Sequence, residues 1–193
     1  MKYILSQAAG RSTKPVYDCM VVSAINAHRH LYPATFDRTK LTRLRKIIYH
    51  KLRANNYSSQ SGGRHQQEGI DAKYDQFNCK VVTKYLKVQR IPMNLFEPEI
   101  FGSCIENKLI NNNPVEVYLA WRKYYGGHSV LIIGQNKTHY QVVNYFKIEF
   151  GDPLFQNRAH RWVCKNIIHK QITYNACFWV HKFNCLFFYK KGT

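Results

Sequence analysis

The feature that most limits the fold of this chain is the apolar run from Ser129 to Gly134, which follows two glycines and a histidine. A run of β-branched and aliphatic residues bounded by glycines predicts a buried strand. The histidine, His128, opens this strand instead of lying within its apolar part. A rigid strand end can hold an imidazole in place and still leave it open to a substrate. His128 is therefore a candidate functional residue, and the alternative is a strand-end histidine that only contacts solvent.

Two helices are predicted before this strand. Apolar residues recur at helical spacing from Met20 to Leu31, and Pro33 ends the pattern. A second helix is predicted over 39–57, with an apolar stripe from Leu41 to Leu52. Most of its remaining surface is cationic: Lys40, Arg43, Arg45, Lys46, Lys51 and Arg53. Such a surface indicates either simple solvation or contact with an anionic partner.

The remaining elements make the second half of the chain rich in strands. The patterns predict a helix over 70–86, a short strand over 88–96 broken by Pro92, and a helix that starts at Glu97-Pro98-Glu99 and ends in the asparagine cluster 111–113. They then predict strands over 115–121, 128–134 and 139–150 with a turn at 135–137, a helix over 157–172, and one or two closing strands over 176–190. Helices followed by an antiparallel sheet predict an α+β fold. We expect one domain over 1–193, with a mainly helical half at 1–112 and a mainly β half at 113–193.

Composition limits the class of protein and its partners. The 193 residues are 45% hydrophobic and 15% aromatic, which is enough for a folded core. No apolar run reaches membrane-spanning length and no signal-peptide core is recognisable, so we expect a cytoplasmic protein or one secreted by a route without a recognisable signal peptide. With 29 Lys and Arg against 11 Asp and Glu, the net charge of +18 favours an acidic partner or nucleic acid.

The six cysteines contain no Cys-x-x-Cys pair, and free thiols are expected in a chain without a secretory signal. A late group suggests zinc at first: Cys164, His169, Cys177, His181 and Cys185. If residues 177–188 form a strand, however, Cys177 and Cys185 lie roughly 26 Å apart, which is too far for ligands of one zinc ion. The sequence predicts no metal and no cofactor.

One cysteine, Cys19, falls in the first turn of the first predicted helix. The N–H groups and the positive end of a helix dipole favour a thiolate there. The same N–H groups can stabilise an oxyanion on an attacked carbonyl. The alternative is a small apolar residue packed at a helix start, because free cysteine is often buried.

A thiol nucleophile needs a base, and the base needs an acceptor that orients its other ring nitrogen. A hairpin places such an acceptor roughly 14–20 residues after the histidine. Asn144 lies within this window, and its alternative role is that of an outward-facing strand residue. Asp152 lies beyond the window, in a Gly-Asp-Pro sequence that is also typical of a turn. Geometry alone leaves both residues open.

Three motifs together resemble papain-like cysteine peptidases of the bacterial C39-like and effector-protease group. They are Asp-Cys at 18–19 before a small and apolar helix, Gly-Gly-His-Ser-Val-Leu-Ile-Ile-Gly at 126–134, and Gly-Asp-Pro-Leu at 151–154. The strand at 114–121 also resembles the one that precedes the histidine in this group. The resemblance implies a papain-like fold, with Cys19 as nucleophile, His128 as general base, Asp152 or Asn144 as orienting residue, and Gln7 as oxyanion donor.

The resemblance implies a cysteine-dependent hydrolase that cleaves peptide or isopeptide bonds in a protein or peptide substrate. Deamidation or acyl transfer by the same nucleophile is an alternative, because papain-like effectors also perform these reactions. A third interpretation is a catalytically inactive basic module that binds nucleic acid or another polyanion through its cationic surface.

Overall fold

The computed structural model describes residues 19–33, 38–53, 84–94, 98–120, 127–143 and 160–181. Its elements in chain order are α1 (Cys19–Leu31), α2 (Arg38–Arg53), β1 (Val88–Asn94), α4 (Pro98–Ile110), β2 (Val115–Ala120), β3 (Gly127–Gln135), β4 (His139–Val143), β5 (His160–Cys164), α5 (Lys165–Gln171) and β6 (Ile172–His181). The fold is α+β, as the sequence predicted. The predicted helix over 70–86 lies mostly outside the described residues.

Six strands form a single antiparallel sheet in the order β1-β6-β2-β3-β4-β5. The hairpin of β2 and β3 lies at its centre, and β6 pairs with β2 on one side while β4 pairs with β3 on the other. Strand β1 comes from the first half of the chain, yet it pairs along its whole length with β6 from the end of the described chain. The strand that carries His128 is therefore central and held by pairing on both sides.

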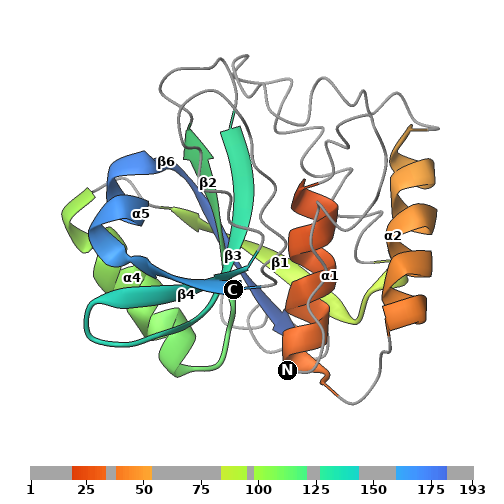
Figure 1. Ribbon diagram of the computed structural model, residues 1–193, viewed down its shortest axis with the longest axis horizontal. Coiled ribbons are helices and arrows are strands. Elements are labelled where there is room, and N and C mark those ends of the chain that lie inside the picture. The colour runs from red at the N-terminus through yellow and green to blue at the C-terminus, as the bar shows by residue number, and fades with distance from the viewer. Residues whose placement is uncertain are drawn as a thin grey trace, which may run out of the picture.

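Helices cover both faces of this sheet (Figure 1). Helix α1 packs on one face, with α2 behind it, and their core includes buried Ile25, Ile48 and Leu131. Helices α4 and α5 lie on the opposite face, where Ile105 and Ile168 pack against the other set of strand residues. We call these the α1 face and the α4/α5 face.

Helix α1 is confirmed where the sequence predicted it, and it is buried on nearly all sides. Its apolar residues between Val21 and Ala27 are each at most 1% exposed. A helix with this pattern must have neighbours all around, and α1 lies between the sheet and α2. Helix α2 is more one-sided: Ile48 is buried, whereas Arg43 and Lys46 are exposed.

Two sequence expectations are wrong. The helix predicted over 157–172 is instead β5, which pairs with β4, followed by the shorter helix α5. Pairing along β4 supplies backbone partners that a local pattern cannot reveal. Pro92 does not break its strand, because β1 lies at the edge of the sheet, where the missing N–H is tolerated.

The strand β6 also begins at Ile172, earlier than the predicted closing strand. The turn predicted at 135–137 is confirmed: the side-chain oxygen Oδ1 of Asn136 accepts hydrogen bonds from the backbone N–H groups of Thr138 and His139 at 2.9 and 2.7 Å. This Asx-type turn joins β3 to β4. The β3–β4 hairpin is therefore closed by a local interaction that the sequence predicted.

Candidate active site

The first turns of α1 meet the beginning of β3. The Ser129 side-chain oxygen lies 3.2 Å from the Ser23 side-chain oxygen, and the Ser23 hydroxyl lies 3.5 Å from the Ser129 carbonyl oxygen. Both side chains are buried. Ser23 is one helical turn after Cys19, and Ser129 directly follows His128. The helix start that carries the candidate nucleophile and the strand start that carries the candidate base are thus neighbours.

The other end of α1 shows that the helix runs in the same direction as β3. The backbone N–H of Lys87 donates to Nδ1 of His28 at 3.0 Å. The ring of Tyr32 packs edge-on against that of His181, with centroids 4.5 Å apart. His181 ends β6, and β6 and β3 both run antiparallel to β2, so they end at the same side of the sheet. The start of α1 therefore lies at the side of the sheet where β3 begins (Figure 1).

Cys19 is the first residue of α1, forms no disulfide and is only 4% exposed. Burial raises the pKa of Tyr118, and the nearby Cys19 raises it further. Tyr118 pairs with Ser129 in the β2–β3 ladder, and the adjacent pair is Leu119 with His128. Cys19 therefore lies near enough to the Tyr118 side chain to influence it, and Tyr118 belongs to the residue pair next to that of His128.

The structure describes less of the other predicted site residues. His128 is the second residue of β3, and its backbone position is described. Gln7, Asn144 and Asp152 lie outside the described residues. The contact of Cys19 with the His128 imidazole, and the choice between Asp152 and Asn144, stay predictions.

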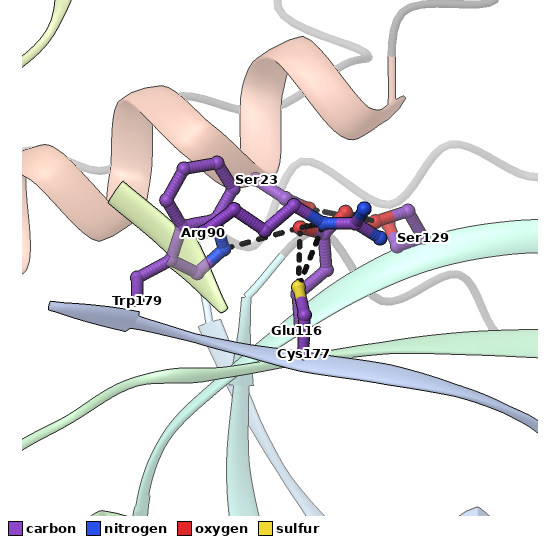
Figure 2. Close-up of polar contacts among 6 residues, drawn as sticks. All are labelled: Ser23, Arg90, Glu116, Ser129, Cys177 and Trp179. Carbon is purple, nitrogen blue, oxygen red and sulfur yellow. Dashed lines mark hydrogen bonds and ion pairs between the residues drawn. The ribbon is translucent and has the colours of Figure 1, made fainter. Parts of the chain in front are cut away.

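A second group of residues on the α1 face escaped the sequence analysis. Glu116 of β2 is 3% exposed and accepts hydrogen bonds from the Ser129 hydroxyl, from Nε1 of Trp179 at 3.1 Å and from the Cys177 thiol at 3.4 Å. Nε of Arg90 lies 3.7 Å from the same carboxylate. Figure 2 shows these side chains converging on Glu116 from several strands, below α1. We call Ser23, Ser129, Glu116, Arg90, Cys177 and Trp179 the Glu116 network.

Chemistry assigns the direction of the hydrogen bonds in this network. A serine hydroxyl has a single proton to donate, and a carboxylate is a stronger acceptor than another hydroxyl. Ser129 therefore donates to Glu116, and Ser23 donates to an oxygen of Ser129. The network forms a chain from α1 through β3 to β2, which ends on a buried negative charge.

The thiol in this network is a structural one. Burial raises the pKa of Cys177 well above its ordinary value, and the Arg90 guanidinium opposes this shift only in part. Nε of Arg90 donates to the Cys177 sulfur at 2.8 Å. A buried, protonated thiol is a poor nucleophile. Of the two cysteines that are buried in the described part of the chain, Cys19 is therefore the better candidate.

Comparisons with known proteins add no relative: no protein-family model, no curated protein and no solved structure matches this chain. Within the described residues, no group of three or more potential metal ligands is present. No helix in that part of the chain is both long and apolar enough to cross a membrane.

Proposed function

We propose that the protein is a papain-like cysteine hydrolase that cleaves peptide or isopeptide bonds. The observation that supports this proposal is that the start of α1, which carries Cys19, contacts the start of β3, which carries His128, through the pair of Ser23 and Ser129. A nucleophile at a helix start and a base on an adjacent rigid strand are the two parts that thiol catalysis needs.

In the proposed reaction, the Cys19 thiolate attacks the carbonyl carbon of the scissile bond, and the resulting oxyanion is stabilised by N–H groups at the start of α1. The C–N bond then breaks as the His128 imidazolium gives a proton to the leaving amine. Water, activated by neutral His128, hydrolyses the thioester and releases the acid and the free thiol. Asp152 or Asn144 would orient the imidazole, and Gln7 would donate to the oxyanion.

The position of Ser129 sets a geometric requirement for this mechanism. Ser129 faces α1, and successive side chains of a regular strand point to opposite faces of a sheet. A Cys19–His128 contact therefore requires the start of β3 to depart from this regular alternation, so that the imidazole can approach the thiol. The proposed pair must be tested by reactivity.

The exposure of the cysteines makes site-resolved alkylation a sharp test. Cys104 and Cys164 are partly exposed, whereas Cys19 and Cys177 are buried. Exposure alone predicts that Cys104 and Cys164 react with iodoacetamide before Cys19. Activation by the helix and by His128 predicts the reverse order near neutral pH. Peptide mass spectrometry after timed alkylation measures all four rates in one sample.

The matched variants are His128→Ala and His139→Ala, the second at a strand-start histidine on the exposed β3–β4 turn. We expect His128→Ala to slow the alkylation of Cys19 to the rate of a buried thiol, while His139→Ala leaves it unchanged. Wild-type Cys19 that reacts more slowly than Cys104 and Cys164 would contradict the proposal. That result would identify Cys19 as a core-packing residue.

A second candidate function has its own observation. Helix α2 contains no acidic residue, and Arg43 and Lys46, three positions apart on one face, are both exposed on the side away from the core. With a net charge of +18, this surface suits a polyanion such as nucleic acid. The double variant Arg43→Glu/Lys46→Glu should weaken the binding of a labelled single-stranded oligonucleotide, measured by anisotropy at two salt concentrations. The control is the double variant Lys108→Glu/Lys170→Glu, which changes the net charge equally. An equal loss of oligonucleotide affinity in both double variants would mean that binding depends only on net charge.

A further inference from the structure

We propose that Ser23, Ser129 and Glu116 act as positioning residues that hold the start of α1 at a fixed distance from the start of β3. This inference rests on the proposed cysteine-hydrolase function, because it assigns the network the task of aligning Cys19 with His128. It identifies no further group that touches the substrate.

The Glu116 network is energetically costly. A carboxylate that is 3% exposed loses most of its hydration, which is costly unless hydrogen bonds and a counter-charge replace it. An apolar side chain between Val115 and Val117 would fill the same layer without this cost. The Glu116 network therefore does more than fill space: it fixes the directions in which hydroxyl groups must point.

The chain of hydrogen bonds connects the two elements that carry Cys19 and His128. It begins on α1 at Ser23, about 6 Å along the helix axis from Cys19 at about 1.5 Å per residue. It crosses to β3 at Ser129, the residue next to His128. A slide or rotation of α1 that breaks the Ser23–Ser129 contact would also move the thiol relative to the strand start. A misplacement of about 1 Å in a catalytic pair can reduce the rate roughly a hundredfold.

The sheet has another polar cluster, on the α4/α5 face. There Nζ of Lys165 contacts Glu106 and Gln135, and the Tyr140 hydroxyl lies 3.0 Å from Nε2 of His169. This cluster joins α4, α5 and the β3–β4 hairpin. The Glu116 network, in contrast, links the helix that carries Cys19 to the strand that carries His128, through the contact of Ser23 with Ser129.

The test compares Cys19 alkylation rates between pH 5 and 9 in Ser23→Ala, Ser129→Ala and the double variant. We expect each single variant to slow Cys19 at least roughly tenfold and to change its pH profile, because the imidazole no longer sits beside the thiol. Since both hydroxyls act through one contact, the double variant should be no slower than the slower single variant. Glu116→Gln, which keeps an acceptor oxygen, should be affected less than either.

Two controls separate positioning from loss of stability. Val142→Ala removes a buried side chain on the α4/α5 face and should lower the melting temperature without changing the Cys19 pH profile. Ser103→Ala removes an exposed hydroxyl that bonds only locally, to the Ile100 carbonyl oxygen at 2.8 Å, and should change neither property. Circular dichroism confirms that each variant is folded.

The outcomes distinguish the two proposals. Fast Cys19 alkylation in the wild type with unchanged rates in all three network variants would overturn the positioning role and leave the hydrolase proposal standing. Effects of Ser23→Ala and Ser129→Ala that multiply in the double variant would also overturn it, because they would show independent structural losses. Slow alkylation of wild-type Cys19 would overturn the hydrolase proposal itself, and the positioning role with it.

Discussion

The two faces of the sheet are built differently. On the α4/α5 face, the side chains of β2 that point inward are Val115, Val117 and Leu119, and all three are buried and apolar. On the α1 face, the alternate residues of the same strand are Glu116 and Tyr118, one buried and one mostly buried. One strand thus contributes an ordinary apolar core to one layer and a polar network to the other.

This difference separates two roles of the β2 side chains: stabilising the fold and fixing the relative positions of helix and strand. Apolar packing stabilises in proportion to the area that it removes from water, and it tolerates small shifts between elements. A buried hydrogen-bonded network contributes less net free energy, but it is satisfied in only a narrow range of positions. The β2 side chains on the α4/α5 face therefore contribute to stability mainly through the apolar area that they bury. On the α1 face, Glu116 of the same strand helps to specify the relative positions of α1 and the strands.

The largest expected effect that tests this comparison is that of Glu116→Ala. The change removes the acceptor shared by Ser129, Trp179 and Arg90 from a buried site, and breaking such a pair typically costs about 3–5 kcal/mol. The neighbouring Val117→Ala, on the α4/α5 face, should cost about 2 kcal/mol for the lost apolar contact. Urea unfolding of both variants measures the two free energies. If Glu116→Ala lowers the free energy of unfolding no more than Val117→Ala does, the network contributes no more to stability than an apolar contact.

The second expected effect is acid sensitivity of the α1 face. Burial, together with the charges of Lys87 and His181, lowers the pKa of His28 from 6.5 to about 4. Below pH 6.5 the unfolded chain binds a proton at this histidine that the folded chain does not, so the stabilisation present above pH 6.5 is lost as the pH falls towards 4. We expect a loss of about 1–3 kcal/mol from this residue.

The variant His28→Asn isolates this contribution. The asparagine oxygen can still accept the hydrogen bond that the Lys87 N–H gives to Nδ1, but it does not titrate. Unfolding free energies at pH 7 and pH 4.5 should differ less in the variant than in the wild type. His169→Gln provides the comparison on the other face, where burial and Lys165 also lower the pKa of the histidine. If His169→Gln reduces the pH dependence of the unfolding free energy more than His28→Asn does, the acid sensitivity belongs to the α4/α5 face and not to the α1 face.

The sequence predicted the elements whose signals are local. The apolar positions of α1, the proline at the start of α4 and the Asn136 turn each act within a few residues, and all three are confirmed. The helix predicted over 157–172 failed because the pairing of β5 with β4 is a long-range interaction. Local periodicity carries no information on which strand will lie beside another.

The Glu116 network was missed for a related reason. The alternation Val115-Glu116-Val117 predicts a strand with one polar face, and a polar face usually contacts solvent. The sequence did contain a contrary signal, since α1 is apolar on nearly all sides and must therefore be covered by other elements. Combining the two patterns would have predicted that a helix lies over Glu116. The identity of its partners, Ser129, Trp179 and Arg90, depends on the register of four strands.

The smallest expected effect lies where the two layers meet, at the end of α4. Asn112 has a φ of 57°, and its backbone N–H donates to the Leu109 carbonyl oxygen as the helix closes. Its side-chain oxygen Oδ1 lies 2.9 Å from Nε2 of His30, so it also contacts the end of α1. Asn112→Ala should cost about 1 kcal/mol, because the left-handed conformation is strained for alanine. Asn112→Gly relieves this strain but still lacks the His30 contact. If that contact couples the layers, Asn112→Gly should also remain less stable than the wild type in urea unfolding. A glycine variant as stable as the wild type would mean that Asn112 serves only to end α4. The two faces would then be joined through the sheet alone.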